Sequence, residues 1–179
     1  MGETVHPGDL GGFVQSEENL SQDGPCWVFQ NAIAAEDAVV AGNAQIRDHA
    51  VVRGSALISG KAVVLNHSLV EDRAIVTAGV VAGDSRVAGN ARITKSPWTQ
   101  AAPHVESSLV YGDISGNVRL TSGAQVLPGQ IFDNPTLDEL HITDEHIKIV
   151  RGPERETPAL TPPENWTPAQ QKSRSHPQR

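Results

Sequence analysis

The chain has 179 residues, of which 38% are hydrophobic and only 4% aromatic, with one cysteine and a formal net charge of −7. One cysteine excludes an internal disulfide, and with neither a membrane-length apolar run nor a signal-peptide pattern we expect a cytoplasmic protein. The net negative charge belongs to the first 46 residues, which contain no Lys or Arg. No basic stripe is available for a phosphate backbone, so we expect neither nucleic-acid nor membrane binding.

Residues 1–25 precede the main sequence pattern and are predicted to form an N-terminal cap. The turn-rich stretch Gly8–Gly12 is followed by Phe13, Val14 and Leu20, which are apolar enough to plug one end of a solenoid. The glycines do not form a phosphate loop, because no Lys-Ser or Lys-Thr pair follows them. An uncapped solenoid end is an open sheet edge that invites pairing with other chains, so a cap is the better interpretation.

From Cys26 to about Val110 the sequence repeats a six-residue unit of a small residue, any residue and an aliphatic residue, as in Ala44-Gln45-Ile46. Fifteen such units follow one another, with two shortened to five residues. Residues two apart in an extended chain point the same way, so the first and third side chains face inward. Three strands and three corners form an eighteen-residue coil, and coils stacked about 4.8 Å apart form a parallel β-helix.

The repeat predicts one all-β domain, a β-helix over residues 26–131 with about five to six coils. Residues 132–150 are predicted to be a C-terminal cap that closes the far end or lies along a face. Within this cap, residues 136–139 fit a capping box for a short helical turn. Ile147 and Ile149 alternate with polar residues as in a strand.

Two proline-containing stretches require separate interpretation. Residues 97–103 contain Trp98 and lead to His104. Their prolines are compatible with a protruding loop, but their units keep the six-residue spacing, which favours a continued coil. Residues 151–179 include six prolines and few apolar side chains, so we expect a disordered tail in which Trp166 is a weak candidate docking anchor.

The segment GDLGGFVQSEENLSQ at residues 8–22, followed by CWV at 26–28, resembles the N-terminal signature of uncharacterised bacterial and phage-borne hexapeptide-repeat proteins of the YdcK type. The likeness is close over residues 8–28, whereas residues 29–126 share only the general style of the repeat. It implies a left-handed coil, since the spacing alone does not set the hand. Members commonly carry a further strand-forming segment before this signature, so either the cap is reduced or the native start lies upstream of Met1.

The middle residues of the units point outward in three columns, and two columns begin with three aliphatic residues. The predicted columns are Ile33, Val51, Leu69, Arg86 and His104; Val39, Leu57, Ile75 and Arg92; and Trp27, Gln45, Val63, Val80 and Trp98. The strand propensity of branched residues explains the aliphatic stripes without any function. Exposed apolar stripes also mark interfaces, and the resemblance implies a cyclic homo-oligomer, with a trimer favoured.

The catalytic candidates lie at one predicted corner, where His49 and His67 are one coil apart, with Asn31 below and Asp84 above. A histidine can act as a general base while a carboxylate orients its ring. The same column equally fits four solvated corner residues without a role. Two imidazoles and a carboxylate are also metal-ligand types, but no further partner residues support them and we expect no metal.

Two functions remain open from the sequence. The first is a non-catalytic scaffold or protein-binding protein of phage or mobile-element type, which needs no cofactor, self-associates through its apolar faces and meets a partner with a basic surface. The second, implied by the resemblance, is an acyltransferase that uses a coenzyme A or acyl-carrier thioester with a histidine base. In that case Arg86, Arg92 and Trp98 are the candidates for binding the coenzyme.

Overall fold

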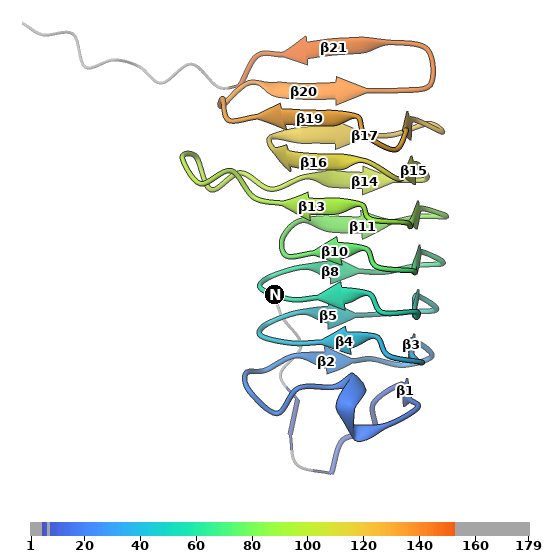
Figure 1. Ribbon diagram of the computed structural model, residues 1–179. Helices are drawn as coiled ribbons and strands as arrows, with labels where there is room; N and C mark the ends of the chain where they lie inside the picture. The colour runs from blue at the N-terminus through green and yellow to red at the C-terminus, as the bar shows by residue number, and fades with distance from the viewer. Residues whose placement is uncertain (1–4, 7, 153–179) are drawn as a thin grey trace, which may run out of the picture.

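The computed structural model describes residues 5–6 and 8–152, which form a triangular parallel β-helix (Figure 1). Three sheets make the walls, and each strand pairs with the strand one coil above and below it. Sheet A contains β1 (Phe13–Val14), β3 (Ile33–Ala34), β6 (Val51–Val52), β9 (Leu69–Val70), β12 (Arg86–Val87), β15 (Leu109–Val110) and β18 (Gln125–Val126). Sheet B contains β4 (Val39–Val40), β7 (Leu57–Ile58), β10 (Ile75–Val76), β13 (Arg92–Thr94), β16 (Asp113–Gly116) and β19 (Ile131–Asn134). Sheet C contains β2 (Trp27–Val28), β5 (Gln45–Ile46), β8 (Val63–Val64), β11 (Val80–Ala82), β14 (His104–Glu106), β17 (Val118–Leu120), β20 (Glu139–Ile142) and β21 (Ile147–Val150).

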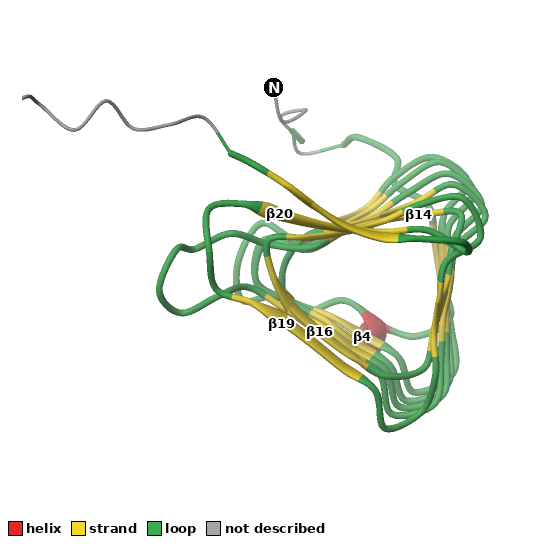
Figure 2. Cartoon of the chain, turned by 90° about the horizontal axis from the view of Figure 1, so that it is seen from above, coloured by secondary structure: helices red, strands yellow, loops and turns green. Residues whose placement is uncertain are grey.

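The coil is left-handed, as the resemblance implies. Figure 2 looks down the axis from the C-terminal end, and the chain passes clockwise from sheet C through sheet A to sheet B. Successive coils rise toward the viewer from β2 to β20 (Figure 1), and a clockwise path that approaches the viewer is a left-handed helix. Six coils are complete, from β2–β4 to β17–β19, and β20 begins a seventh.

The predicted inward positions form the core. Ala44 and Ile46 of one unit are fully buried, and the third positions Ile58 and Ile93 are among the largest fully buried side chains. The small first residue leaves room beside each corner, where three walls converge on a narrow interior. Where serine takes this place it stays buried, because its hydroxyl donates to a backbone carbonyl, as Ser85 Oγ does to Ala82 O at 2.6 Å.

The corner between sheets C and A holds a ladder of side-chain hydrogen bonds. Gln30, Asp48 and Asn66 occupy equivalent places with φ of 52°, 60° and 61°. The amide N of Asp48 donates to Gln30 Oε1 at 3.1 Å, and the amide N of Asn66 donates to Asp48 Oδ2 at 2.9 Å. Asn and Asp tolerate this left-handed conformation better than most residues, and here their side chains also bind the next coil.

The N-terminal cap differs from the prediction. Phe13 and Val14 do not plug the core, since they are 63% and 43% exposed and extend sheet A as β1, with Phe13 on the outward side. The end is covered instead by Leu20, which packs on the core, and by Asn19, which is 1% exposed at the end of the 3-10 turn η1 (Glu17–Asn19). The Asn19 amide donates to two main-chain carbonyls of the first coil, at 2.9 and 2.8 Å.

The C-terminal cap is a hairpin of β20 and β21, which pair antiparallel. The strand at Ile147 and Ile149 is confirmed, but the helical turn over 136–139 is wrong. The Thr136 hydroxyl bonds to Asn134 Oδ1 at 2.7 Å, within a loop that leads directly into β20. Residues 153–179, most of the predicted tail, lie outside the described residues. The part of the chain that the structure describes contains no helix long and apolar enough to cross a bilayer.

The continued coil over residues 97–103 is also wrong. The segment between β13 and β14 projects from the solenoid as a loop (Figure 1), and Trp98 on it is 82% exposed. Proline supplies no N–H for a strand ladder, so Pro97 and Pro103 do not support the coil that their spacing imitates. His104 consequently pairs with Val80 in sheet C, whereas the sequence placed it in the column of sheet A.

Candidate functional site

The histidine column forms as the spacing predicts, at the corner between sheets C and A. The rings of His49 and His67 stack with centroids 5.3 Å apart and planes inclined by 14°. Asn31 Nδ2 lies 3.4 Å from His49 Nε2, and Asp84 Oδ1 lies 3.9 Å from His67 Nδ1. The column therefore brings together all four residues that were grouped from the sequence.

The environment of this column is open. The side chains of His67 and Asp84 are 70% and 86% exposed. The distance between them exceeds that of a hydrogen bond, so Asp84 does not orient the His67 ring by direct contact. Among the described residues, no cluster of three or more His, Cys, Asp or Glu side chains is placed to hold a metal ion. The column thus has the residue types of an acid–base site, but it lies open to solvent.

A charged cluster occupies the corner between sheets A and B. The Glu71 carboxylate is buried and accepts from Arg53 Nε at 2.9 Å and from Arg86 Nε at 2.6 Å. Hydrogen bonding to Glu71, reinforced by its charge, raises the pKa of both guanidiniums above their ordinary value. Both arginine side chains remain about half exposed. Arg86 is thus a member of an ion-paired corner and not a free cation for a coenzyme phosphate.

The three coenzyme-binding candidates do not converge. Arg86 belongs to sheet A, and Arg92 lies exposed on sheet B, where it is in register with Asp113. Trp98 lies on the projecting loop. A single subunit therefore offers no site that contains all three.

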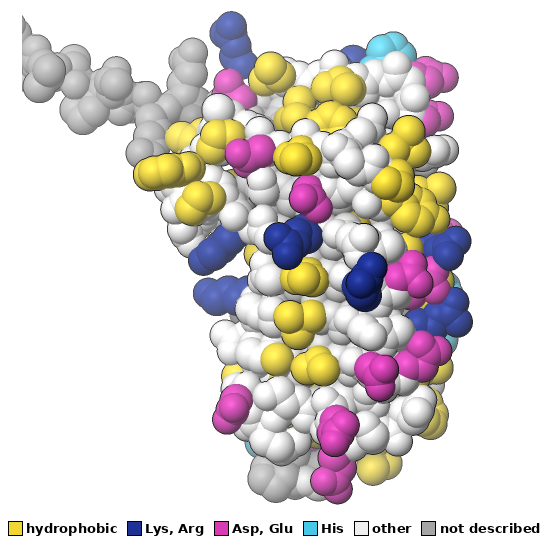
Figure 3. All heavy atoms as spheres, viewed as in Figure 1, with side chains coloured by type: hydrophobic (Ala, Val, Ile, Leu, Met, Phe, Trp, Pro, Cys, Tyr) yellow, Lys and Arg dark blue, Asp and Glu magenta, His cyan; other side chains and the backbone are white. Residues whose placement is uncertain are grey.

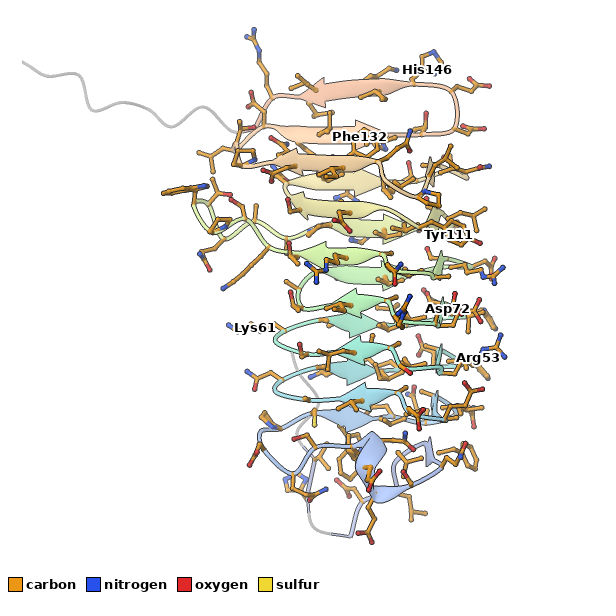
Figure 4. The ribbon with its side chains drawn as sticks, viewed as in Figure 1. Arg53, Lys61, Asp72, Tyr111, Phe132 and His146 are labelled. Carbon is orange, nitrogen blue, oxygen red and sulfur yellow. The ribbon has the colours of Figure 1, made fainter. Side chains whose placement is uncertain are left out.

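The loop covers a cavity that the sequence did not reveal. The space has a volume of about 420 Å³ and lies between the loop and the corner of sheets B and C, with Lys61, Lys95 and Gln100 among its lining residues. The Lys95 ammonium donates to Gln100 Oε1 at 2.5 Å. Figure 4 shows Lys61 at the edge of the solenoid from which the loop projects. The sequence signals for the loop were its two prolines and the lack of a small and an aliphatic residue at positions 97 and 99.

Two aliphatic stripes run along the outer faces of sheets A and B. Ile33, Val51 and Leu69 are in register on sheet A, as are the equivalent residues on sheet B. The sheet B stripe consists of Val39, Leu57 and Ile75. Ile33 and Val39 are 37% and 36% exposed, and the other four are half-buried. Figure 3 shows the sheet B side, where hydrophobic side chains run up the middle of the face below a basic group.

No family model matches this sequence, and no curated protein matches it either. The function of this chain is therefore inferred from its own residues. The resemblance over residues 8–28 stays a prediction.

Proposed function

We propose that the protein is a non-catalytic scaffold, of the phage or mobile-element type that the resemblance implies, which self-associates through the aliphatic stripes on sheets A and B. The stripes carry this proposal, because they place three aliphatic side chains in succession on each of two adjoining flat walls. A wall that faces only water ordinarily carries polar residues at its outward positions. Contiguous exposed apolar residues are typical of interaction surfaces.

The placement of the stripes on two different walls supports a cyclic assembly. In a ring each subunit uses one patch to contact a different patch of its neighbour, and closure of the ring leaves no patch free. A trimer is the size that the resemblance favours. The acidic first 46 residues lie largely in the cap and first coil, and their charge suits a protein partner with a basic surface.

Three substitutions in one coil test the proposal. Leu57→Glu and Val51→Glu place a carboxylate in the stripes of sheets B and A, and Gln45→Glu places one at the equivalent outward position of sheet C. Light scattering should give a molar mass about three times the 19.0 kDa of one chain for the natural protein and the Gln45→Glu variant. In dilute solution, where weaker contacts between assemblies are absent, the two stripe variants should approach the mass of one chain. A monomeric natural protein, or equal masses for all variants, would refute the proposal.

The acyltransferase remains a second candidate because of the cavity under the projecting loop. Lys61 and Lys95 beside apolar lining atoms suit the phosphates and the pantetheine arm of a coenzyme A thioester. The loop and the histidine column lie at different corners of the solenoid (Figure 2), so a subunit that donates its loop would act on the column of its neighbour.

A thermal-shift titration with acetyl coenzyme A tests this candidate. A ligand that binds only the native state raises the unfolding temperature. The shift should disappear in Lys61→Ala and persist in Arg73→Ala, an exposed cation that does not line the cavity. Transfer activity, where found, should require His67 or His49. The absence of any shift at millimolar thioester would exclude this function.

A further inference from the structure

Sheet C ends in a strand whose outer edge is unpaired among the described residues. β21 lies at the top of the solenoid (Figure 1) and is antiparallel to β20, whereas every other described strand pair is parallel. At the N-terminal end the edge of sheet B is covered, since the amide of Ser21 donates to Val40 O and the side chain of Asn19 binds two further carbonyls. An exposed strand edge is a template for a further strand.

The hydrogen bonds of β20 determine which backbone groups of β21 are free. The amide N of Leu140 donates to Asn117 O, and Ile142 O accepts from the amide N of Thr121. The main-chain groups of Leu140 and Ile142 therefore point toward β17. Neighbouring residues of a strand direct their main-chain groups to opposite sides, so the residues opposite Leu140 and Ile142 in β21 point away from β20.

Those residues are Ile149, opposite Leu140, and Ile147, opposite Ile142. Each directs its N–H and C=O toward the open edge. Their side chains lie on the core side of sheet C, because Ile142 is a core residue, yet they are 61% and 72% exposed for Ile147 and Ile149. The edge thus presents two isoleucines together with four main-chain groups that have no partner among the described residues.

Charged residues flank this edge in a self-complementary order. At every second position the chain reads Glu145, Ile147, Ile149 and Arg151. Ile147 and Ile149 share one face of β21, whereas Glu145 lies in the hairpin turn before the strand and Arg151 directly follows it; both charged side chains are exposed. When two copies of this segment lie antiparallel, the acidic residue of each copy is opposite the basic residue of the other. The isoleucines of the two copies are then opposite each other in the middle.

We infer that β21 binds β21 of a second copy, antiparallel, about a two-fold axis through Lys148. Ile147 then lies opposite Ile149 of the second copy, and Glu145 lies opposite Arg151 of the second copy. The contact is isologous, so the same surface serves both partners. Two sheets C become one continuous sheet across the axis, with four isoleucines clustered on its inner side. This end-to-end contact is independent of the stripes on the side walls.

Lys148 limits the strength of the contact. It points to the outer side of sheet C and lies opposite its own copy on the axis. Like charges directly opposite each other in a sheet are destabilising. Replacement of Lys148 by Thr should therefore increase the fraction of end-to-end dimer at a given concentration, even though it makes the net charge of −7 more negative by one unit.

Disulfide crosslinking of the full-length chain tests the register. Residues opposite themselves on the axis have Cα atoms about 4.5 Å apart, within the range of a disulfide. Lys148→Cys should thus give a covalent dimer under mild oxidation. Val150→Cys is the matched control, because the two copies of residue 150 lie four positions apart, about 13 Å, beyond that range. The natural thiol, Cys26, is buried and contributes no background.

Charge reversal provides the second arm. Arg151→Glu and Glu145→Arg, each combined with Lys148→Cys, should reduce crosslinking, and the two reversals together should restore it. No crosslink above that of the Val150→Cys control, or no restoration when both charges are reversed, would overturn the inference. The same measurement in a Leu57→Glu background leaves β21 unchanged, so a failure of the end-to-end contact is distinguishable from a failure of the stripes.

Discussion

Asn19→Ala is the substitution whose effect the structure defines best. The side-chain amide donates to the carbonyls of Glu36 and Ala38, and its oxygen accepts from the amide N of Ser16 at 2.8 Å. The Ala38 carbonyl is buried, whereas Glu36 is exposed and its hydrogen bond to Asn19 is only partly buried. A buried carbonyl left without a donor costs about 1–3 kcal/mol, and a partly solvated one about 1 kcal/mol. We expect a loss of about 2–4 kcal/mol.

Urea unfolding followed by circular dichroism measures this loss. Asn19→Asp keeps the size and the bond from Ser16 but aims a carboxylate oxygen at two carbonyls, so it should destabilise more than Asn19→Ala. Gln22→Ala is the control, since Gln22 is exposed and makes one bond, to Leu20 O at 3.2 Å. A loss below about 0.5 kcal/mol for Asn19→Ala, within the range of ordinary surface changes, would refute the role of this side chain as the cap.

Three further outcomes follow from burial. Ala62→Leu, at a fully buried first position, should cost about 1–3 kcal/mol in urea unfolding, while Val63→Leu, one residue on and facing outward, should change stability by less than about 0.5 kcal/mol. Burial raises the pKa of the Cys26 thiol, so the stability that this shift contributes is complete below the ordinary pKa of a thiol and is lost as pH rises through the raised pKa. A thiol reagent should react with Cys26 only on unfolding. His67→Ala should change stability by less than about 0.5 kcal/mol, as expected for a side chain that is 70% exposed.

The architecture was predictable because the same six-residue pattern recurs in every coil. A small residue at Ala44 and an aliphatic one at Ile46 are each forced by the geometry of a narrow triangular interior. The histidine column was predictable for the same reason, since equal spacing along the chain becomes equal position in successive coils. The corner ladder was only partly visible, because Gln30 and Asp48 bind across coils in a conformation that the sequence signals clearly only for glycine.

The incorrectly predicted elements lie where the expected spacing continues but the residue types that the structure requires are missing. Pro97 and Thr99 keep the six-residue distance but offer neither a small inward residue nor an aliphatic one, and the segment leaves the wall. The columns were extrapolated through this loop, so His104 was assigned to the wrong sheet. The helical turn at Thr136 failed similarly, since its hydroxyl bonds to a nearby asparagine instead of a helix N-terminus.

In a solenoid each coil contacts only the coils above and below it, so a loop can leave one corner without disturbing the walls beyond it. β14 accordingly resumes sheet C directly above β11, and Val105 returns to the core. The interior is therefore nearly uninformative about function, because every unit satisfies the same packing rule. Evidence about function comes from the places that depart from this packing rule, which are the outward stripes, the loop over its cavity and the antiparallel edge that ends the stack.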